Sequence, residues 1–225
     1  MSAVSLLPKA AIPFVCSWSG GKDSCLALYS AMRAGARPSF LLTMFDESGE
    51  RSRSHGLTKG VLQAQTALMG IPWVTRMASW SEYESVFIAA LQELKKVGVK
   101  AGVFGDIDIE DHRLWEEKVC KAASIEAYLP LWKAPRTALL DEFLVLGFNA
   151  TIIATCDEKV DKKYLGRALD AELISEFTCI GIDPSGEEGE YHTIVTDGPI
   201  FAQPLQVRMG GQVFRSGYWF LELEV

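Results

Sequence analysis

Short apolar segments alternate with longer amphipathic segments through the first half of the chain. The short segments predict strands at residues 12–17, 40–45, from 71–72 onward and at 101–105, and the longer ones predict helices at 24–34, 59–69 and 82–97. Strands that alternate with helices of this length form a parallel sheet with helices on both faces. We therefore expect an α/β fold with a doubly wound, Rossmann-like parallel sheet.

The pattern changes after residue 133. A helix is predicted at 136–147, a strand at 150–155 and a mostly helical region at 162–177. The tail is rich in β-formers at residues 193–195, 205–207 and 213–223. We expect two domains, an α/β domain at 1–133 and a smaller α+β domain at 134–225.

Composition and charge narrow the class of protein. The chain is 48% hydrophobic and 23% charged, which is typical of a globular protein. Its net charge is -7, and the cationic runs at 51–53 and 159–163 are short and interpreted as solvated surface, so stable binding of a nucleic acid is not expected.

The cysteines and the N-terminus predict the compartment. The five cysteines form no CxxC pair, which favours reduced thiols in a cytosol. Cys156 is expected to be a small buried apolar residue rather than a nucleophile. Residues 1–18 lack the charged start of a leader, and no apolar run is long enough to cross a membrane. We expect a cytoplasmic protein with no membrane partner.

The hexapeptide Ser19-Gly20-Gly21-Lys22-Asp23-Ser24 lies directly after the first predicted strand and opens a helix. Glycines allow close approach of the backbone, and the N–H groups of a first helical turn favour an anion, so the pattern predicts a phosphate site. It fits neither GxxxxGK[ST] nor GxGxxG. The alternative is a glycine-rich turn capped by Ser24 with a surface lysine.

The hexapeptide resembles the pyrophosphatase loop of the ATP pyrophosphatases, whose fold is that of the adenine nucleotide alpha hydrolases. The resemblance implies that Ser19, Gly20, Gly21 and Ser24 bind phosphate oxygens of ATP. It also implies that Lys22 neutralises these oxygens and acts in catalysis, as does Asp23, which would help to bind Mg²⁺. ATP and Mg²⁺ are therefore the expected cofactors.

Further stretches resemble the diphthine-ammonia ligase group of these proteins across nearly the whole chain after residue 12. They are Gly105-Asp106-Ile107, residues 112–117, Cys120, residues 129–132, 164–167, 186–193 and 197–201. The resemblance implies an ATP-dependent ligase that adenylates a carboxylate, releases pyrophosphate and passes the acyl group to ammonia. Free ammonium is the expected donor, because no glutaminase signature is visible.

Candidate residues of the first domain follow predicted strands. Gly105 and Asp106 would lie where open α/β sheets bind ligands, with Asp106 on a ribose hydroxyl or the metal, or simply capping the next helix. The resemblance implies that Arg113 is a catalytic residue that clamps a phosphate or the substrate carboxylate. The alternative is an ion pair with Glu117, a candidate substrate-binding residue four positions on.

Other candidates rest on position. Met44 and His55 follow the second predicted strand and would lie near the adenine of ATP. His112 is interpreted as a helix-start residue, and Trp115 and Trp132 as packing residues.

Acidic residues gather between glycines in the second domain. Glu187 and Glu190 are candidate substrate-binding residues for a cationic group or ammonia, with Glu190 and His192 as catalytic candidates and His192 as a base. The alternative is a solvated acidic loop. Glu188 stands where the resembling group commonly has a glycine or small polar residue, so the substrate of this loop stays open.

Several functions remain distinct alternatives. The resembling group acts on elongation factor 2, which implies a diphthine substrate in an archaeal or eukaryotic protein and a small-molecule or corrinoid carboxylate in a bacterial one. A non-catalytic ATP sensor is a further alternative, and transfer RNA thiolation or lysine addition is disfavoured by the acidity of the chain. A homodimer is expected.

Overall fold

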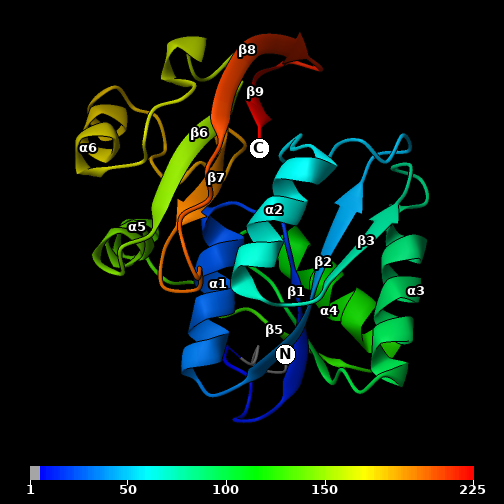
Figure 1. Cartoon of the computed structure of the whole chain (residues 1–225). Helices are drawn as coiled ribbons and strands as arrows, with labels where there is room; N and C mark the ends of the chain where they lie inside the picture. The colour runs from blue at the N-terminus through cyan, green and yellow to red at the C-terminus, as the bar shows by residue number, and fades with distance from the viewer. Residues whose placement is uncertain (1–5) are drawn as a thin grey trace. The chain divides into compact units, whose positions relative to one another are not determined.

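A computed structural model describes residues 6–225 (Figure 1). By its internal contacts the chain divides into two compact units. The first unit contains the described residues up to Ser19 together with Asp23–Arg53 and Gly70–Ala134, and the second contains Gly20–Lys22, Ser54–Met69 and Pro135–Val225. The first five residues of the segment predicted not to be a leader lie outside the described part. The boundary at residue 134 stays a prediction.

The first unit contains a five-stranded parallel sheet of order β3-β2-β1-β4-β5. Its strands are β1 (Pro13–Ser17), β2 (Arg37–Phe45), β3 (Trp73–Met77), β4 (Ala101–Val103) and β5 (Glu126–Tyr128). The predicted α/β class is confirmed, and β5 is a strand that the sequence analysis missed. The strand order changes direction between β1 and β4. In open α/β sheets, ligands bind in the crevice at the carboxyl ends of the strands at such a point.

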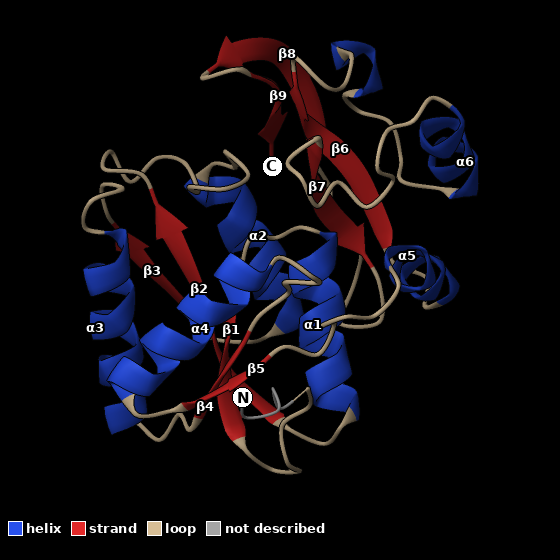
Figure 2. Ribbon diagram, turned by 180° about the vertical axis from the view of Figure 1, so that it is seen from behind, coloured by secondary structure: helices blue, strands red, loops and turns tan. Residues whose placement is uncertain are grey.

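Helices α3 (Tyr83–Lys96) and α4 (Glu110–Ala123) cover one face of this sheet (Figure 2). Residues of a strand alternate between faces, so Val15 of β1 packs toward these helices while Cys16 faces the other way. The Cys16 thiol lies 3.9 Å from the carbonyl oxygen of Ser24 in α1 (Lys22–Arg33). Helices thus lie on both faces, as a doubly wound sheet requires.

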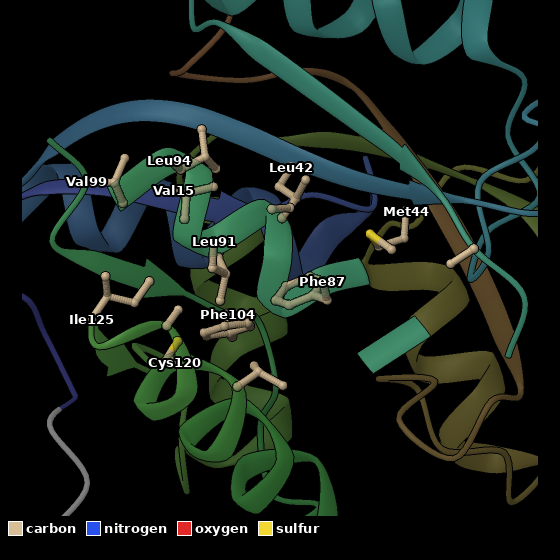
Figure 3. Close-up of a cluster of buried hydrophobic side chains, with 14 of the residues drawn as sticks. Val15, Leu42, Met44, Phe87, Leu91, Leu94, Val99, Phe104, Cys120 and Ile125 are labelled. Atoms are coloured by element: carbon tan, nitrogen blue, oxygen red, sulfur yellow. The ribbon is translucent and has the colours of Figure 1, made fainter. Parts of the chain in front are cut away.

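The buried cluster under α3 and α4 holds the first unit together (Figure 3). Phe87, Leu91 and Leu94 of α3 meet Val15 and Leu42 of the sheet, and each is at most 6% exposed. Burying side chains of this size stabilises the fold by about 1.5–3 kcal/mol each. Trp115 and Trp132 are partly buried against the same cluster, in agreement with the packing role predicted for them.

The second unit contains a four-stranded antiparallel sheet of order β7-β6-β9-β8. Its strands are β6 (Asn149–Cys156), β7 (Tyr191–Asp197), β8 (Arg208–Arg215) and β9 (Tyr218–Glu224). The same unit contains α2 (Lys59–Met69), α5 (Arg136–Val145), the 3-10 helix η1 (Lys162–Tyr164) and α6 (Ala171–Cys179). Antiparallel pairing makes this unit α+β.

The structure refines three expectations for the second unit. The mostly helical region at 162–177 contains η1 and most of α6, but it is broken at Gly166, whose φ of 85° leaves the helical range, and α6 begins only after its cap Asp170. The β-formers at 205–207 lie outside the strands. Those at 213–223 belong to two strands, because Ser216 and Gly217 both have positive φ and form the tight turn between β8 and β9.

Smaller differences concern single residues. The third strand begins at Trp73, not at residues 71–72. Cys156 is half-buried rather than buried. The run at 51–53 is not simply solvated, because Ser52 is 5% exposed and the Arg53 side chain 10% exposed. No helix in the described part of the chain is long and apolar enough to cross a membrane.

Candidate functional site

The loop between β1 and α1 carries the predicted phosphate site. Helix α1 begins at Lys22, two residues earlier than predicted, so Lys22 and Asp23 lie in its first turn. The hydroxyl groups of Ser19 and Ser24 are 3.1 Å apart. The N–H groups of a first helical turn lack intrahelical acceptors and the helix dipole favours negative charge there, so the loop has the local structure of an anion site.

Gly20 has a left-handed backbone that is fixed by a buried amide. Its φ is 83°, and its carbonyl oxygen accepts hydrogen bonds from Gln65 Nε2 at 2.9 Å and from Val195 N at 2.9 Å. Gln65 is fully buried and donates also to the Val195 carbonyl at 2.8 Å. This residue was missed, because a glutamine inside a predicted helix gives no sequence signal.

Gly21 lies against His55 and β7. A Cβ atom at Gly21 would be 2.3 Å from the His55 ring and 3.1 Å from the Thr193 carbonyl oxygen. The next residue is held to the same strand, since Lys22 N donates to Thr193 Oγ1 at 3.1 Å. Only glycine fits at position 21, and the hydroxyl of Thr193 was not recognised as a contact of the loop.

The Lys22 side chain is buried although it ends in a charge. The residue is 6% exposed, its Nζ lies 3.9 Å from Glu187 Oε1, and it stands 5.9 Å from the centre of the Tyr191 ring. Burying an ammonium group costs free energy unless it is paired with a negative charge, so a buried lysine here suits a site for an anionic ligand. The arrangement disagrees with a surface lysine on a plain turn.

The rings of His55 and His192 lie against each other at a tilt of 33° in the second unit. Their ring centres are 4.6 Å apart, and His55 Nδ1 donates to the Thr193 carbonyl oxygen at 2.9 Å. Burial lowers the pKa of His55 to about 4, with Lys22 adding to this and the Thr193 hydrogen bond opposing it. Burial, His55 and Lys22 hold the pKa of His192 well below its usual range. Both rings are therefore neutral at neutral pH.

The free energy of unfolding should fall as the pH drops from about 6.5 to about 4. In this window the unfolded chain binds protons that the folded imidazoles reject, so each ring contributes up to about 1.4 kcal/mol per pH unit. Urea unfolding at pH 7, 6 and 5 measures the slope. His55→Gln should flatten it, and an unchanged slope in that variant would contradict the burial of a neutral ring.

The acidic loop is ordered by Asp183. This carboxylate accepts hydrogen bonds from the backbone N–H groups of Ser185 at 3.0 Å and Glu187 at 3.3 Å, and it pairs with Arg136 at 2.6 Å. Burial alone would raise the pKa of Asp183, but these partners outweigh it and lower the pKa. The loop is therefore a built turn rather than loose solvated charge.

Glu190 is the buried acid of this loop. It is 7% exposed, accepts from Glu188 N at 2.9 Å and lies 3.8 Å from Lys159 Nζ. The side chain of Glu188 is exposed, and its carbonyl oxygen accepts from Lys159 Nζ at 2.7 Å. The residue that departs from the resembling group therefore contributes to the turn through its backbone.

Gly105 and Asp106 follow β4 in the first unit. A Cβ at Gly105 would be 2.8 Å from the carbonyl carbon of Asp23 and 2.9 Å from Ser24 N, so this glycine allows the first turn of α1 to approach. Asp106 Oδ1 lies 2.6 Å from His112 Nδ1. The helix cap of α4 is Ile109, so Asp106 is not the cap that the alternative interpretation required.

Glu116 forms an acid pair with Asp106. Burial and the charge of Asp106 raise the pKa of Glu116 well above its usual range. Burial would also raise the pKa of Asp106, but hydrogen bonds from Glu116 and His112 lower it. One proton is therefore shared, on the side of Glu116, and the second oxygen of Glu116 is buried without a hydrogen-bond partner. No local pattern in the sequence marked Glu116 as a candidate.

The guanidinium of Arg113 forms ion pairs within its own helix, α4. Its guanidinium pairs with Glu110 and with Glu117, the latter at 2.7 Å, and stacks on Trp132 at 5.6 Å. This geometry agrees with the ion-pair interpretation. A role as phosphate or carboxylate clamp, and a substrate-binding role for Glu117, stay predictions.

The structure groups the predicted residues unit by unit. Within the second unit it brings together Gly20, Gly21, Lys22, His55, Glu187 and His192, and within the first it brings together Ser19, Asp23, Ser24, Gly105 and Asp106. Met44 is 5% exposed in the core, and its carbonyl oxygen accepts from Arg53 N at 2.9 Å. An adenine contact of Met44 or His55 stays a prediction.

Comparison with known protein families identifies relatives of this chain. A family model described as "Diphthamide synthase N-terminal domain" matches residues 13–127, and one described as "Diphthamide synthase C-terminal domain" matches residues 136–224. The chain belongs to the diphthamide synthase family. The family predicted from the loop and the later motifs is thereby confirmed.

Curated members of the family carry the name diphthine–ammonia ligase. The human protein is 26% identical over 223 residues, covering 88% of this chain and 84% of its own length. The Danio rerio protein is 25% identical, covering 88% of this chain and 87% of its own. The Schizosaccharomyces pombe protein is 34% identical over 89 residues, which is 38% of this chain and 14% of that protein. These names agree with the predicted enzyme class, a ligase.

One solved structure is similar across the chain at low identity. It is described as a predicted subunit of tRNA methyltransferase from Methanocaldococcus jannaschii, is 15% identical and has a TM-score of 0.43. It covers 82% of this chain and 96% of its own. A score of this size supports no inference about function.

Proposed function

We propose that this member of the diphthamide synthase family is an ATP-dependent amide-forming ligase. In the first step the substrate carboxylate attacks the α-phosphorus of ATP, forming an acyl-adenylate and releasing pyrophosphate. In the second step ammonia attacks the acyl carbon and AMP leaves. The observation that carries the proposal is the loop at 19–24, which combines the first turn of a helix with a buried lysine.

The residues of the loop have distinct roles in this reaction. The hydroxyl groups of Ser19 and Ser24 and the backbone of Gly20 and Gly21 bind the β- and γ-phosphates, and Lys22 neutralises them. Because the loop is fixed before ATP binds, little reorganisation is needed when pyrophosphate leaves. Holding the carboxylate against the α-phosphorus supplies the remaining rate enhancement.

Magnesium fits as a companion of the nucleotide. The described residues contain no group of three or more His, Cys, Asp or Glu that would hold a metal alone. Mg²⁺ is commonly bound by one or two carboxylates and the phosphates of the substrate, so Asp23 in the first turn of α1 suffices as the protein ligand. The ion would offset the phosphate charge.

The acidic loop is the proposed ammonium site. Glu187 and Glu190 carry the negative charge that attracts a cation, and the neutral ring of His192 is available to accept a proton. The proposed acceptor is a carboxylate of the diphthine type, with a small-molecule carboxylate as the other outcome of the test. We propose a cytoplasmic enzyme, and a homodimer stays a prediction that sedimentation would check.

The test is incubation with α-labelled ATP, Mg²⁺, ammonium and a panel of carboxylates that includes diphthine-bearing elongation factor 2. AMP and pyrophosphate should form only when the matching carboxylate is present. ADP and phosphate as sole products would refute adenylation, and tight ATP binding without turnover on any acceptor would favour a nucleotide sensor.

A further inference from the structure

The side chain of Arg53 has a buried donor without a partner at the edge of the first unit's sheet. Arg53 follows β2, where its N–H donates to the Met44 carbonyl, and its side chain is 10% exposed. The Nε atom is shielded from solvent and has no hydrogen-bond acceptor among the described residues. A buried donor of this kind costs about 1–3 kcal/mol unless something outside the protein satisfies it.

The rest of the guanidinium is held in one orientation. Its Nη2 atom donates to the carbonyl oxygen of Ala78, the first residue after β3. The guanidinium lies over the Trp80 ring, with Cζ 4.8 Å from the ring centre. Nη2 also lies 3.0 Å from Glu47, whose side chain is 63% exposed, so this ion pair is weak and easily displaced. A guanidinium that is held in one orientation, with an unsatisfied Nε–H and an easily displaced partner on Nη2, suits a planar oxyanion.

The surroundings of Arg53 are those of a ligand site. Carboxyl ends of parallel strands are where open α/β sheets bind ligands, and β2 and β3 both end here. Trp80 is 70% exposed, so its ring offers apolar surface to a ligand. Tyr83 lies beside it, with the two rings tilted by 32° and their centres 5.7 Å apart.

We propose that Arg53 binds the carboxylate of the acceptor substrate, a role that rests on the function proposed above. The planar fork of Arg53 matches a carboxylate, whereas phosphate is provided for by the loop at 19–24. The pKa of Tyr83, which lies beside Trp80, is raised to about 12 by burial and by Asp106, while the charge of Arg53 opposes this rise.

Arg76 is the matched control within the same unit. It lies in β3, where its guanidinium pairs with Glu93 and its Nη1 atom donates to the Thr75 carbonyl oxygen at 2.8 Å. Arg76 therefore has protein partners for its guanidinium, whereas the Nε atom of Arg53 has none among the described residues.

The test observes the arginine Nε–H signals of the ¹⁵N-labelled full chain by NMR during titration with sodium succinate. Arg53→Lys identifies the Arg53 signal by its loss. Succinate should shift that signal saturably and leave the Arg76 signal in place, and inorganic phosphate should bind roughly tenfold more weakly. No saturable shift, equal shifts of both arginines, or a preference for phosphate would each overturn the proposal.

Kinetics separate this role from the ligase reaction itself. With an acceptor that supports AMP formation, Arg53→Lys should raise the KM for the acceptor roughly ten- to hundredfold and leave the KM for ATP nearly unchanged. Arg76→Lys should change neither. Succinate binding without AMP formation would refute the proposed function alone, and an unchanged acceptor KM would refute the role of Arg53 alone.

Discussion

Lys22→Met should lower the rate of AMP formation at least about a hundredfold while leaving the fold intact. Lys22 is the buried cation at the start of α1, 6% exposed, and its Nζ lies 3.9 Å from Glu187 Oε1. Methionine preserves the length of the side chain and removes the charge that is proposed to neutralise the leaving pyrophosphate. Removing one partner of a buried ion pair can also destabilise a protein, so stability is measured beside the rate.

The measurement is single-turnover AMP formation with saturating ATP, accompanied by urea unfolding of both proteins. Lys118→Met is the control, because Lys118 forms a surface ion pair with Glu84 on the helices that cover the sheet. Activity of Lys22→Met within a few-fold of the natural chain would show that the buried lysine is structural.

Gly20→Ala should destabilise the protein by about 2–4 kcal/mol and abolish ATP binding. The φ of 83° is strained for any residue with a Cβ, and that atom would lie 2.8 Å from both Gln65 Oε1 and Leu62 Cδ2. Gln65 would have to move, and its two hydrogen bonds to Gly20 and Val195 would be lost with it.

Gly60→Ala is the matched control on the same helix as Gln65. Gly60 has an ordinary φ and nothing within 4 Å of its Cβ position, so alanine should leave the free energy of unfolding unchanged or raise it by up to about 1 kcal/mol. Urea midpoints and nucleotide binding by calorimetry give the comparison. Equal midpoints for the two variants would contradict a strained and crowded Gly20.

The elements that the sequence predicted best are those whose pattern is local. The helix at Lys59–Met69 was predicted at its observed bounds, because its apolar spacing and the following Gly70 mark both sides. The strand at β5 was missed, since three residues between a helix and a proline carry too little pattern. The break at Gly166 was missed because apolar residues continued through it at helical spacing.

The residues of the candidate site also differ in how well the sequence predicted them. Ser19 to Ser24 were recognisable because the hexapeptide is contiguous and follows a strand. Gln65, Thr193, Glu116 and Arg53 were not, because each acts through residues far away in the chain: Gln65 bonds to residues 45 and 130 positions away. Arg53 was interpreted as solvated surface, because a short charged run does not indicate that the guanidinium packs over the ring of Trp80.

The sequence by itself determined the family, the parallel sheet and the phosphate loop, because strand period, helix period and a six-residue motif are all written within short windows of the chain. Only the tertiary structure decided which ionisable groups are neutral and which donors lack partners. The shared proton of Asp106 and Glu116, the neutral pair of His55 and His192 and the unsatisfied Nε atom of Arg53 depend on burial and on contacts between distant segments. Burial and electrostatics are properties of the assembled fold, so no window of sequence contains them.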